Sequence, residues 1–215
     1  MDIDHSPAAS WFKSDSDTKQ KENIPMATPR AQKIMIIRHA EKPTTNNSDP
    51  YGVNDNGETD GEGLTVQGWQ RAGALAVLFA PSHGSLQNAE LATPGVLFAA
   101  AVAKHSKSER PEDTITPLSQ KLATQIDSRY TKGQEAAVAE AAVASDGVVL
   151  ICWQHQDIPT IANAILDNQS TVPQKWPGER FDLVWVFDLD QNSGAYRFCQ
   201  VPQQLLKGDL ATIIA

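Results

Sequence analysis

The chain has 215 residues, 40% of them hydrophobic, which is enough for one domain of ordinary size with a packed core. Its formal net charge of −8 argues against a nucleic-acid or anionic-membrane partner, because both need a basic face. No apolar stretch approaches the roughly 20 residues that span a bilayer, and the acidic N-terminus lacks the profile of a signal peptide. We therefore expect a cytoplasmic protein.

The composition divides the chain into two parts. Residues 1–32 contain few apolar side chains, so they cannot bury enough surface to offset the entropy of ordering, and we expect a disordered tail. Residues 33–215 are expected to form one domain. Cys152 and Cys199 lie in apolar runs without the spacing of zinc ligands, which predicts two reduced thiols and no metal site.

The first half of the domain begins with a strand. Residues 34–37 form a short, continuous apolar run of the kind found in buried central strands. A polar, acidic loop follows at residues 44–63. Residues 64–79 have apolar side chains at helical spacing, and Thr65 is a plausible N-cap.

Beyond residue 79, apolar runs alternate with helical segments. Strands are predicted at residues 96–101, 125–130 and 148–153, helices at residues 111–122, 133–144 and 158–166, and an antiparallel strand pair at residues 181–188 and 195–201. This alternation predicts an α/β fold, a three-layer αβα sandwich with a mostly parallel central sheet.

Polar side chains follow three of these strands. Arg38 and His39 come after the first strand, Ser106 and Arg110 lie beyond the second, and His155 follows the most apolar one. In open sheets of this kind, reactive groups gather at the carboxyl ends of the strands. We therefore expect these side chains to lie close together.

Two arginines with two histidines suit the chemistry of a phosphoryl group. During transfer the group spreads negative charge over its equatorial oxygens, and a guanidinium offers a planar fork that matches two of them. A neutral imidazole can attack the phosphorus and become a phosphohistidine. Because the arginines supply the positive charge, no metal and no cofactor is expected.

Four segments, in order along the chain, resemble the motifs of the histidine phosphatase (phosphoglycerate-mutase-like) superfamily. They are IIRHAEK at residues 36–42, GLTVQGWQRA at residues 63–72, SKSERPEDT at residues 106–114 and VLICWQH at residues 149–155. Ala40 stands where most members have glycine, and Gln154 and Gln156 flank His155 in place of a serine and a glycine.

The resemblance implies a role for each matching residue. His39 would be the phosphorylated nucleophile, Arg38 and Arg110 would bind the phosphoryl oxygens, and His155 would be the second pocket histidine. Lys42 falls where other members place a basic or hydroxyl residue near the phosphate.

Further candidates remain open. Ser106 begins the third segment and, like Lys42, is a candidate for substrate binding. A general acid must protonate the leaving oxygen, and the sequence offers three carboxylates: Asp127 is the first choice, Glu135 the second and Asp157 the third. Glu135 and Asp157 are also candidates for substrate contact.

The function expected from this set is that of a metal-independent, histidine acid phosphatase-like phosphomonoesterase acting through phospho-His39. Its partner would be a small phosphorylated substrate or a phosphoprotein. The alternative is a catalytically weak module of the same fold that binds phospho-ligands or acts as a scaffold. A phosphoglycerate-type mutase is less favoured, because the span after Arg110 is short and leaves the site open.

Overall fold

A computed structural model describes Met1 and residues 30–44, 49–104 and 106–215. Nearly all of the predicted tail lies outside these residues. Within them the elements run in the order β1 (Lys33–Arg38), β2 (Gly52–Val53), β3 (Leu64–Thr65), α1 (Val66–Phe79), β4 (Val96–Ala99), α2 (Arg110–Leu122), β5 (Ile126–Asp127), α3 (Glu135–Val143), β6 (Val148–Trp153), α4 (Ile158–Leu166), β7 (Leu183–Leu189) and β8 (Tyr196–Pro202).

The central sheet has six strands in the order β5-β4-β6-β1-β7-β8. The first four strands in this order are parallel to one another. The strands β7 and β8 are antiparallel to their neighbours and complete one side of the sheet. The mostly parallel sheet is thus confirmed, and the carboxyl ends of β4, β6 and β1 meet at one edge.

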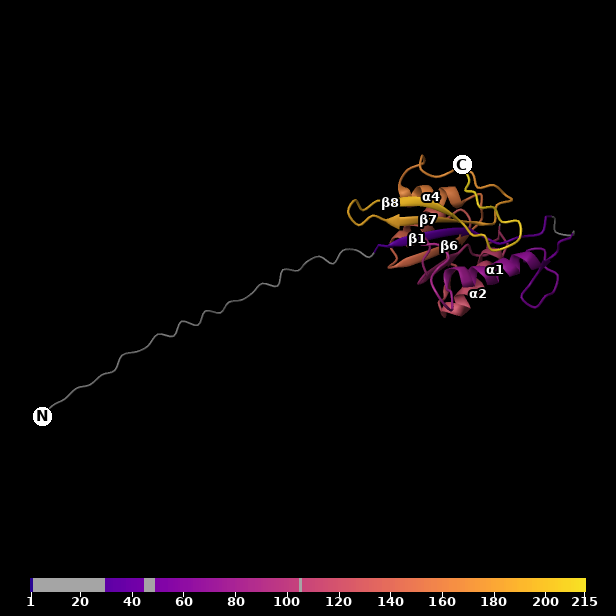
Figure 1. The fold of residues 1–215 in the computed structure, drawn as a ribbon, viewed down its shortest axis with the longest axis horizontal. Helices are drawn as coiled ribbons and strands as arrows, with labels where there is room; N and C mark the ends of the chain where they lie inside the picture. Colours follow the sequence, from indigo (N-terminus) through magenta and orange to yellow (C-terminus); the bar gives the residue numbers. More distant parts are fainter. Residues whose placement is uncertain (2–29, 45–48, 105) are drawn as a thin grey trace.

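Helices cover both faces of this sheet. Along β1, Ile34 and Ile36 pack with α3 and α4, whereas Met35 and Ile37 pack with α1 and α2. This alternation follows from the period of two in a strand, which turns successive side chains to opposite faces. Figure 1 shows α4 on one side of the strands and α1 and α2 on the other, which confirms the three-layer sandwich.

Local differences from the predicted elements have simple causes. The short hairpin of β2 and β3 was not predicted, because two-residue strands in a polar loop carry no hydrophobic period. The helix α1 begins at Val66 because the Thr65 side chain accepts a hydrogen bond from the Gly68 backbone N–H at 3.1 Å, as an N-cap does.

Residues 30 and 31, at the end of the predicted tail, contact the rest of the domain. Ala31 is fully buried, and its backbone N–H donates to the carbonyl of Val143 at 3.0 Å. The side chain of Arg30 donates to the carbonyl of Gly194. The packed body therefore already includes the last residues of the predicted tail. None of the helices in the described part of the chain is long and apolar enough to cross a membrane.

Candidate active site

His39 lies directly after β1 with its ring held in one orientation. Its backbone N–H donates to the carbonyl of Trp153 at 3.0 Å, and its ring Nδ1 lies 2.7 Å from the carbonyl oxygen of Ala40. A carbonyl oxygen only accepts, so Nδ1 must carry the hydrogen. In the neutral imidazole, Nε2 then keeps its lone pair, which is the form that a nucleophile needs.

The surroundings of His39 keep it neutral. Burial, followed by the positive charge of Arg38, lowers the pKa of His39 well below its usual value. The charges of Arg110 and His155 act in the same direction, and the hydrogen bond to Ala40 opposes them only in part. The structure therefore places the other three predicted pocket residues, Arg38, Arg110 and His155, near enough to His39 for their charges to act on its ring.

Arg38 is buried with half of its guanidinium free. Its Nη1 donates to the carbonyl of Gly178 at 2.6 Å and approaches that of Arg180 at 3.4 Å, and the guanidinium carbon lies 3.6 Å from the centre of the Phe181 ring. Its Nε and Nη2 have no hydrogen-bond partner among the described residues. These two nitrogens form one edge of the fork, and buried donors of this kind call for an acceptor such as a phosphate.

Arg110 opens α2 and is held by the acidic loop. Its Nε donates to the carbonyl of Gly63 at 3.0 Å and its Nη2 to that of Gly61 at 2.6 Å, and Glu62 lies 3.6 Å from Nη2. The fork that the sequence assigns to a phosphate is thus bound to backbone oxygens. Arg110 contributes its positive charge to the surroundings of His39 instead.

His155 and Lys42 complete the group. Burial, followed by the charges of Arg38 and Lys42, lowers the pKa of His155 to about 4. Its Nδ1 has no hydrogen-bond partner in the described part of the chain. Burial and the charges of Arg110 and Arg38 also lower the pKa of Lys42. We call Arg38, His39, Lys42, Arg110 and His155 the basic cluster.

Two helices fix the loop that carries His39. The hydroxyl of Thr114 on α2 accepts from the Ala40 N–H at 2.8 Å and donates to the carbonyl of Arg110 at 2.6 Å, so it ties the residue after His39 to Arg110. Gly68 on α1 lies so close that a Cβ there would stand 2.4 Å from the carbonyl oxygen of Glu41. The sequence motifs contained both residues, but their roles became visible only in the structure.

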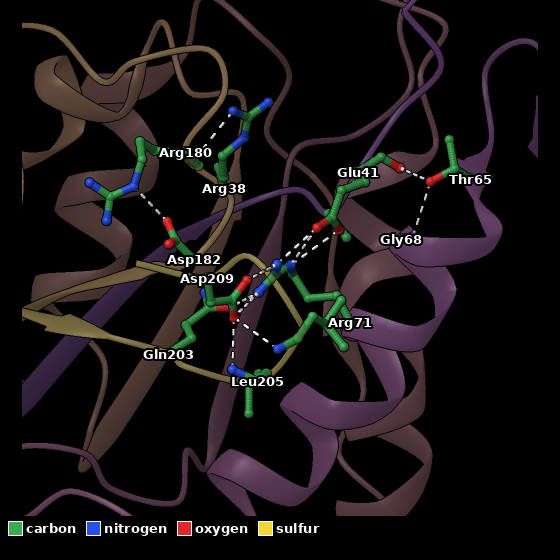
Figure 2. A network of polar contacts seen from close by, with 12 residues as sticks. Arg38, Glu41, Thr65, Gly68, Arg71, Arg180, Asp182, Gln203, Leu205 and Asp209 are labelled. Atoms are coloured by element: carbon green, nitrogen blue, oxygen red, sulfur yellow. Dashed lines mark hydrogen bonds and ion pairs between the residues drawn. The ribbon is translucent and has the colours of Figure 1, made fainter. Parts of the chain in front are cut away.

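A buried ion-pair network holds the other side of the same loop (Figure 2). Arg71 donates to Glu41 through Nε and Nη2, to Asp209 through Nη1 and Nη2, and to Gln203 through Nη1, over distances of 2.7–3.1 Å. Its side chain is only 3% exposed. The network joins α1 and the C-terminal segment to Glu41, two residues after His39.

The three predicted carboxylates contact residues outside the basic cluster. Asp127 is bound twice by Arg129, with distances from 2.6 Å, and this hydrogen bonding lowers the pKa of Asp127, the opposite of what a proton donor needs. Glu135 accepts from the Trp153 indole at 3.2 Å.

Asp157, the third candidate, pairs with Lys132 at 3.5 Å, and burial raises its pKa. Ser106 is half-buried and exchanges backbone hydrogen bonds with Ala103. Among the described residues, none of the carboxylates Asp127, Glu135 and Asp157 has a hydrogen bond or ion pair with the basic cluster.

No protein-family model and no curated protein matches this chain. Among solved structures it is similar to a putative phosphohistidine phosphatase SixA from Agrobacterium tumefaciens, with 13% identity over 78% of this chain and 96% of that one and a TM-score of 0.46. It is also similar to a mycobacterial glucosyl-3-phosphoglycerate phosphatase in complex with VO3, with 13% identity over 79% of this chain and 97% of that one and a TM-score of 0.41.

A third similar structure is that of a putative alpha-ribazole-5'-P phosphatase from Escherichia coli, with 13% identity over 83% of this chain and 100% of that one and a TM-score of 0.42. The three structures are those of phosphatases, the class that the sequence motifs predict. At 13% identity and TM-scores below 0.5, these similarities assign no activity to this chain.

Proposed function

We propose that this chain is a phosphomonoesterase of the histidine phosphatase type, which transfers the phosphoryl group of a monoester to Nε2 of His39 and then to water. The observation that carries the proposal is the pairing of two features. The Nε and Nη2 edge of the buried Arg38 has no hydrogen-bond partner among the described residues, and the neighbouring His39 is held by Ala40 in the tautomer of a nucleophile.

Substrate binding follows from the free hydrogen-bond donors. The Nε and Nη2 edge of Arg38 takes two phosphoryl oxygens, and the Nδ1 of His155 can donate to another. Arg110 and Lys42 add positive charge, which offsets the charge of the phosphate. The physiological substrate in this proposal is a small phosphorylated molecule or a phosphoprotein.

The reaction needs two displacements. In the first, the bond between phosphorus and His39 Nε2 forms while the ester bond breaks, and the leaving oxygen takes up a proton. In the second, water attacks the phosphohistidine, the P–N bond breaks, and inorganic phosphate leaves. The arginines stabilise the charge on the equatorial oxygens throughout, so that we expect no requirement for a metal or a cofactor.

One observation favours the second candidate function, a weakly catalytic module that binds phospho-ligands. Asp127 and Glu135 are hydrogen-bonded to Arg129 and Trp153, and Asp157 pairs with Lys132 at 3.5 Å; within the described residues none of the three contacts the basic cluster through a hydrogen bond or ion pair. Such a pocket would bind a phosphorylated ligand and hydrolyse it slowly.

The two functions are separated by an assay of 4-nitrophenyl phosphate in the presence of a chelator, over roughly pH 4 to 8. We expect hydrolysis that the chelator leaves unchanged. A protein that binds inorganic phosphate in calorimetry without hydrolysing the ester would support the binding module. Absence of both binding and hydrolysis would contradict both functions.

A further inference from the structure

The loop of residues 176–182, which precedes β7, contacts Arg38 and lies next to His155 in the basic cluster. The carbonyl oxygens of Gly178 and Arg180 both face Nη1 of Arg38, at 2.6 and 3.4 Å. A Cβ on Gly178 would stand 3.5 Å from Nε2 of His155. Glu179, the residue between these two contacts, therefore has its backbone next to the basic cluster.

This loop is firmly anchored on its other side. Arg180 donates to the carboxylate of Asp182 at 2.7 Å and to the carbonyl of Thr212 at 2.6 Å. The Trp176 indole donates to the carbonyl of Arg180 at 2.7 Å, and its ring packs on Trp185. The backbone of Glu179 thus has a defined position, whereas its side chain is exposed to solvent.

The carboxylate of Glu179 is free and acts on the cluster. No hydrogen bond or ion pair within the described residues occupies it. Burial lowers the pKa values of Arg38 and His155. The negative charge of Glu179 acts in the opposite direction on both and offsets part of this lowering. Glu41 also acts on Arg38, but Arg71 binds its carboxylate on two nitrogens.

A cavity lies beside Glu179. A cavity of about 400 Å³ is lined by Glu179, Arg180 and Phe181 on one side and by Glu41 and Arg71 on the other. Figure 2 shows Arg38 and Arg180 close together, across from Glu41 and Arg71. Phe181 lies between this cavity and the basic cluster, since it lines the cavity while its ring packs on Arg38 and lies 6.3 Å from the His39 ring.

We propose that Glu179, which the sequence motifs do not mark, is the proton donor for the leaving group in this site. As the bond from phosphorus to His39 Nε2 forms, the protonated carboxyl of Glu179 gives its proton to the departing ester oxygen, and an alcohol enters the cavity. The carboxylate then takes a proton from the water that attacks the phosphohistidine, which restores both residues. The assignment rests on the proposed phosphatase function and extends it to alkyl monoesters, such as phosphates of polyols and sugars.

The test compares two esters that differ in their need for a proton donor. Nitrophenolate leaves readily without a proton, whereas an alkoxide does not. We expect Glu179→Gln to lower kcat for glycerol 2-phosphate by about 100-fold, the usual scale of general acid catalysis, and kcat for 4-nitrophenyl phosphate by less than about fivefold. Glu179→Asp should restore part of the lost rate.

Matched variants sharpen this test. Glu140→Gln changes an exposed glutamate on α3 and should leave both rates unchanged. Asp127→Asn, Glu135→Gln and Asp157→Asn should not show the selective loss. An equal loss on both esters, no loss in Glu179→Gln, or a selective loss in one of these three would overturn the assignment.

The outcome also separates this inference from the function on which it rests. If the unchanged protein hydrolyses neither ester, both fail. If it hydrolyses 4-nitrophenyl phosphate through His39 but spares glycerol 2-phosphate, or if Glu179→Gln acts on both esters alike, the phosphatase stands and the role of Glu179 falls.

Discussion

Replacing His39 with alanine is expected to lower kcat/KM for 4-nitrophenyl phosphate by at least about 1,000-fold, as removal of a covalent nucleophile does in other enzymes. The imidazole provides the Nε2 lone pair that attacks phosphorus, and its orientation comes from the bond between Nδ1 and the Ala40 carbonyl. Steady-state kinetics in chelator, with the thermal unfolding of both proteins compared, measures the effect on activity apart from any effect on folding.

A second histidine serves as the control for this variant. His83→Ala changes an exposed side chain of the 80–90 loop and should leave kcat/KM unchanged. Retention of more than about a tenth of the rate in a folded His39→Ala protein would show that another group carries the reaction.

Replacing Arg71 with methionine is expected to lower the free energy of unfolding by about 3–5 kcal/mol at neutral pH. The change leaves the carboxylates of Glu41 and Asp209, 13% and 6% exposed, without their shared partner. Breaking a buried pair on one side is costly because the remaining charges stay desolvated. Urea unfolding followed by circular dichroism gives the value.

The pH dependence of this loss has a defined sign. In the native protein, burial raises the pKa of Asp209, but hydrogen bonds from Arg71 and the backbone outweigh burial and hold the pKa below its usual value. A lowered pKa stabilises the fold above the unfolded-state value, and this contribution is lost as the pH falls. Without Arg71, Asp209 protonates more readily, so the difference between the two proteins should shrink in acid.

Two further variants test the reason for the loss. Adding Glu41→Gln and Asp209→Asn to Arg71→Met should recover part of the stability, because the uncompensated charges are removed. Arg129→Met removes an equally close pair with Asp127, but Arg129 is 75% exposed and solvent screens its charge, so that little change is expected. Equal losses in Arg71→Met and Arg129→Met would contradict the importance of burial.

The sequence predicted the regular elements well where a strong local signal exists. The strand β6 and the helix α4 have the predicted bounds, the first because its apolar run is continuous and the second because Pro159 opens the helix and Asp167 closes it in a left-handed conformation. The strand β5 is shorter than predicted, because its pairing with β4 stops after Asp127.

The candidate site was predictable in part, for a topological reason. Arg38, His39, Arg110 and His155 share one neighbourhood, because the carboxyl ends of parallel strands meet at one edge. That rule does not find Glu179. The strand β7 is antiparallel to β1, so the loop before β7 reaches the same edge from the amino end of its strand.

The contacts made by loop backbones could also not be predicted from the sequence. The carbonyls of Gly61 and Gly63 occupy the fork of Arg110, and nothing in the residue types of an acidic loop predicts that its backbone oxygens bind an arginine. The side chain of Asp127 turned out to be paired with its near neighbour Arg129, a contact two residues apart that competes with any role in the pocket.

The most direct test of the proposed mechanism is to trap the intermediate on His39. The protein would be mixed with 4-nitrophenyl phosphate, quenched in alkali during turnover, digested and mapped by mass spectrometry. We expect a phosphoryl group on His39 that survives alkali, is lost in acid and is absent from the His39→Ala protein. Turnover with no phosphoryl group on His39, or with the group on His155 instead, would contradict the mechanism.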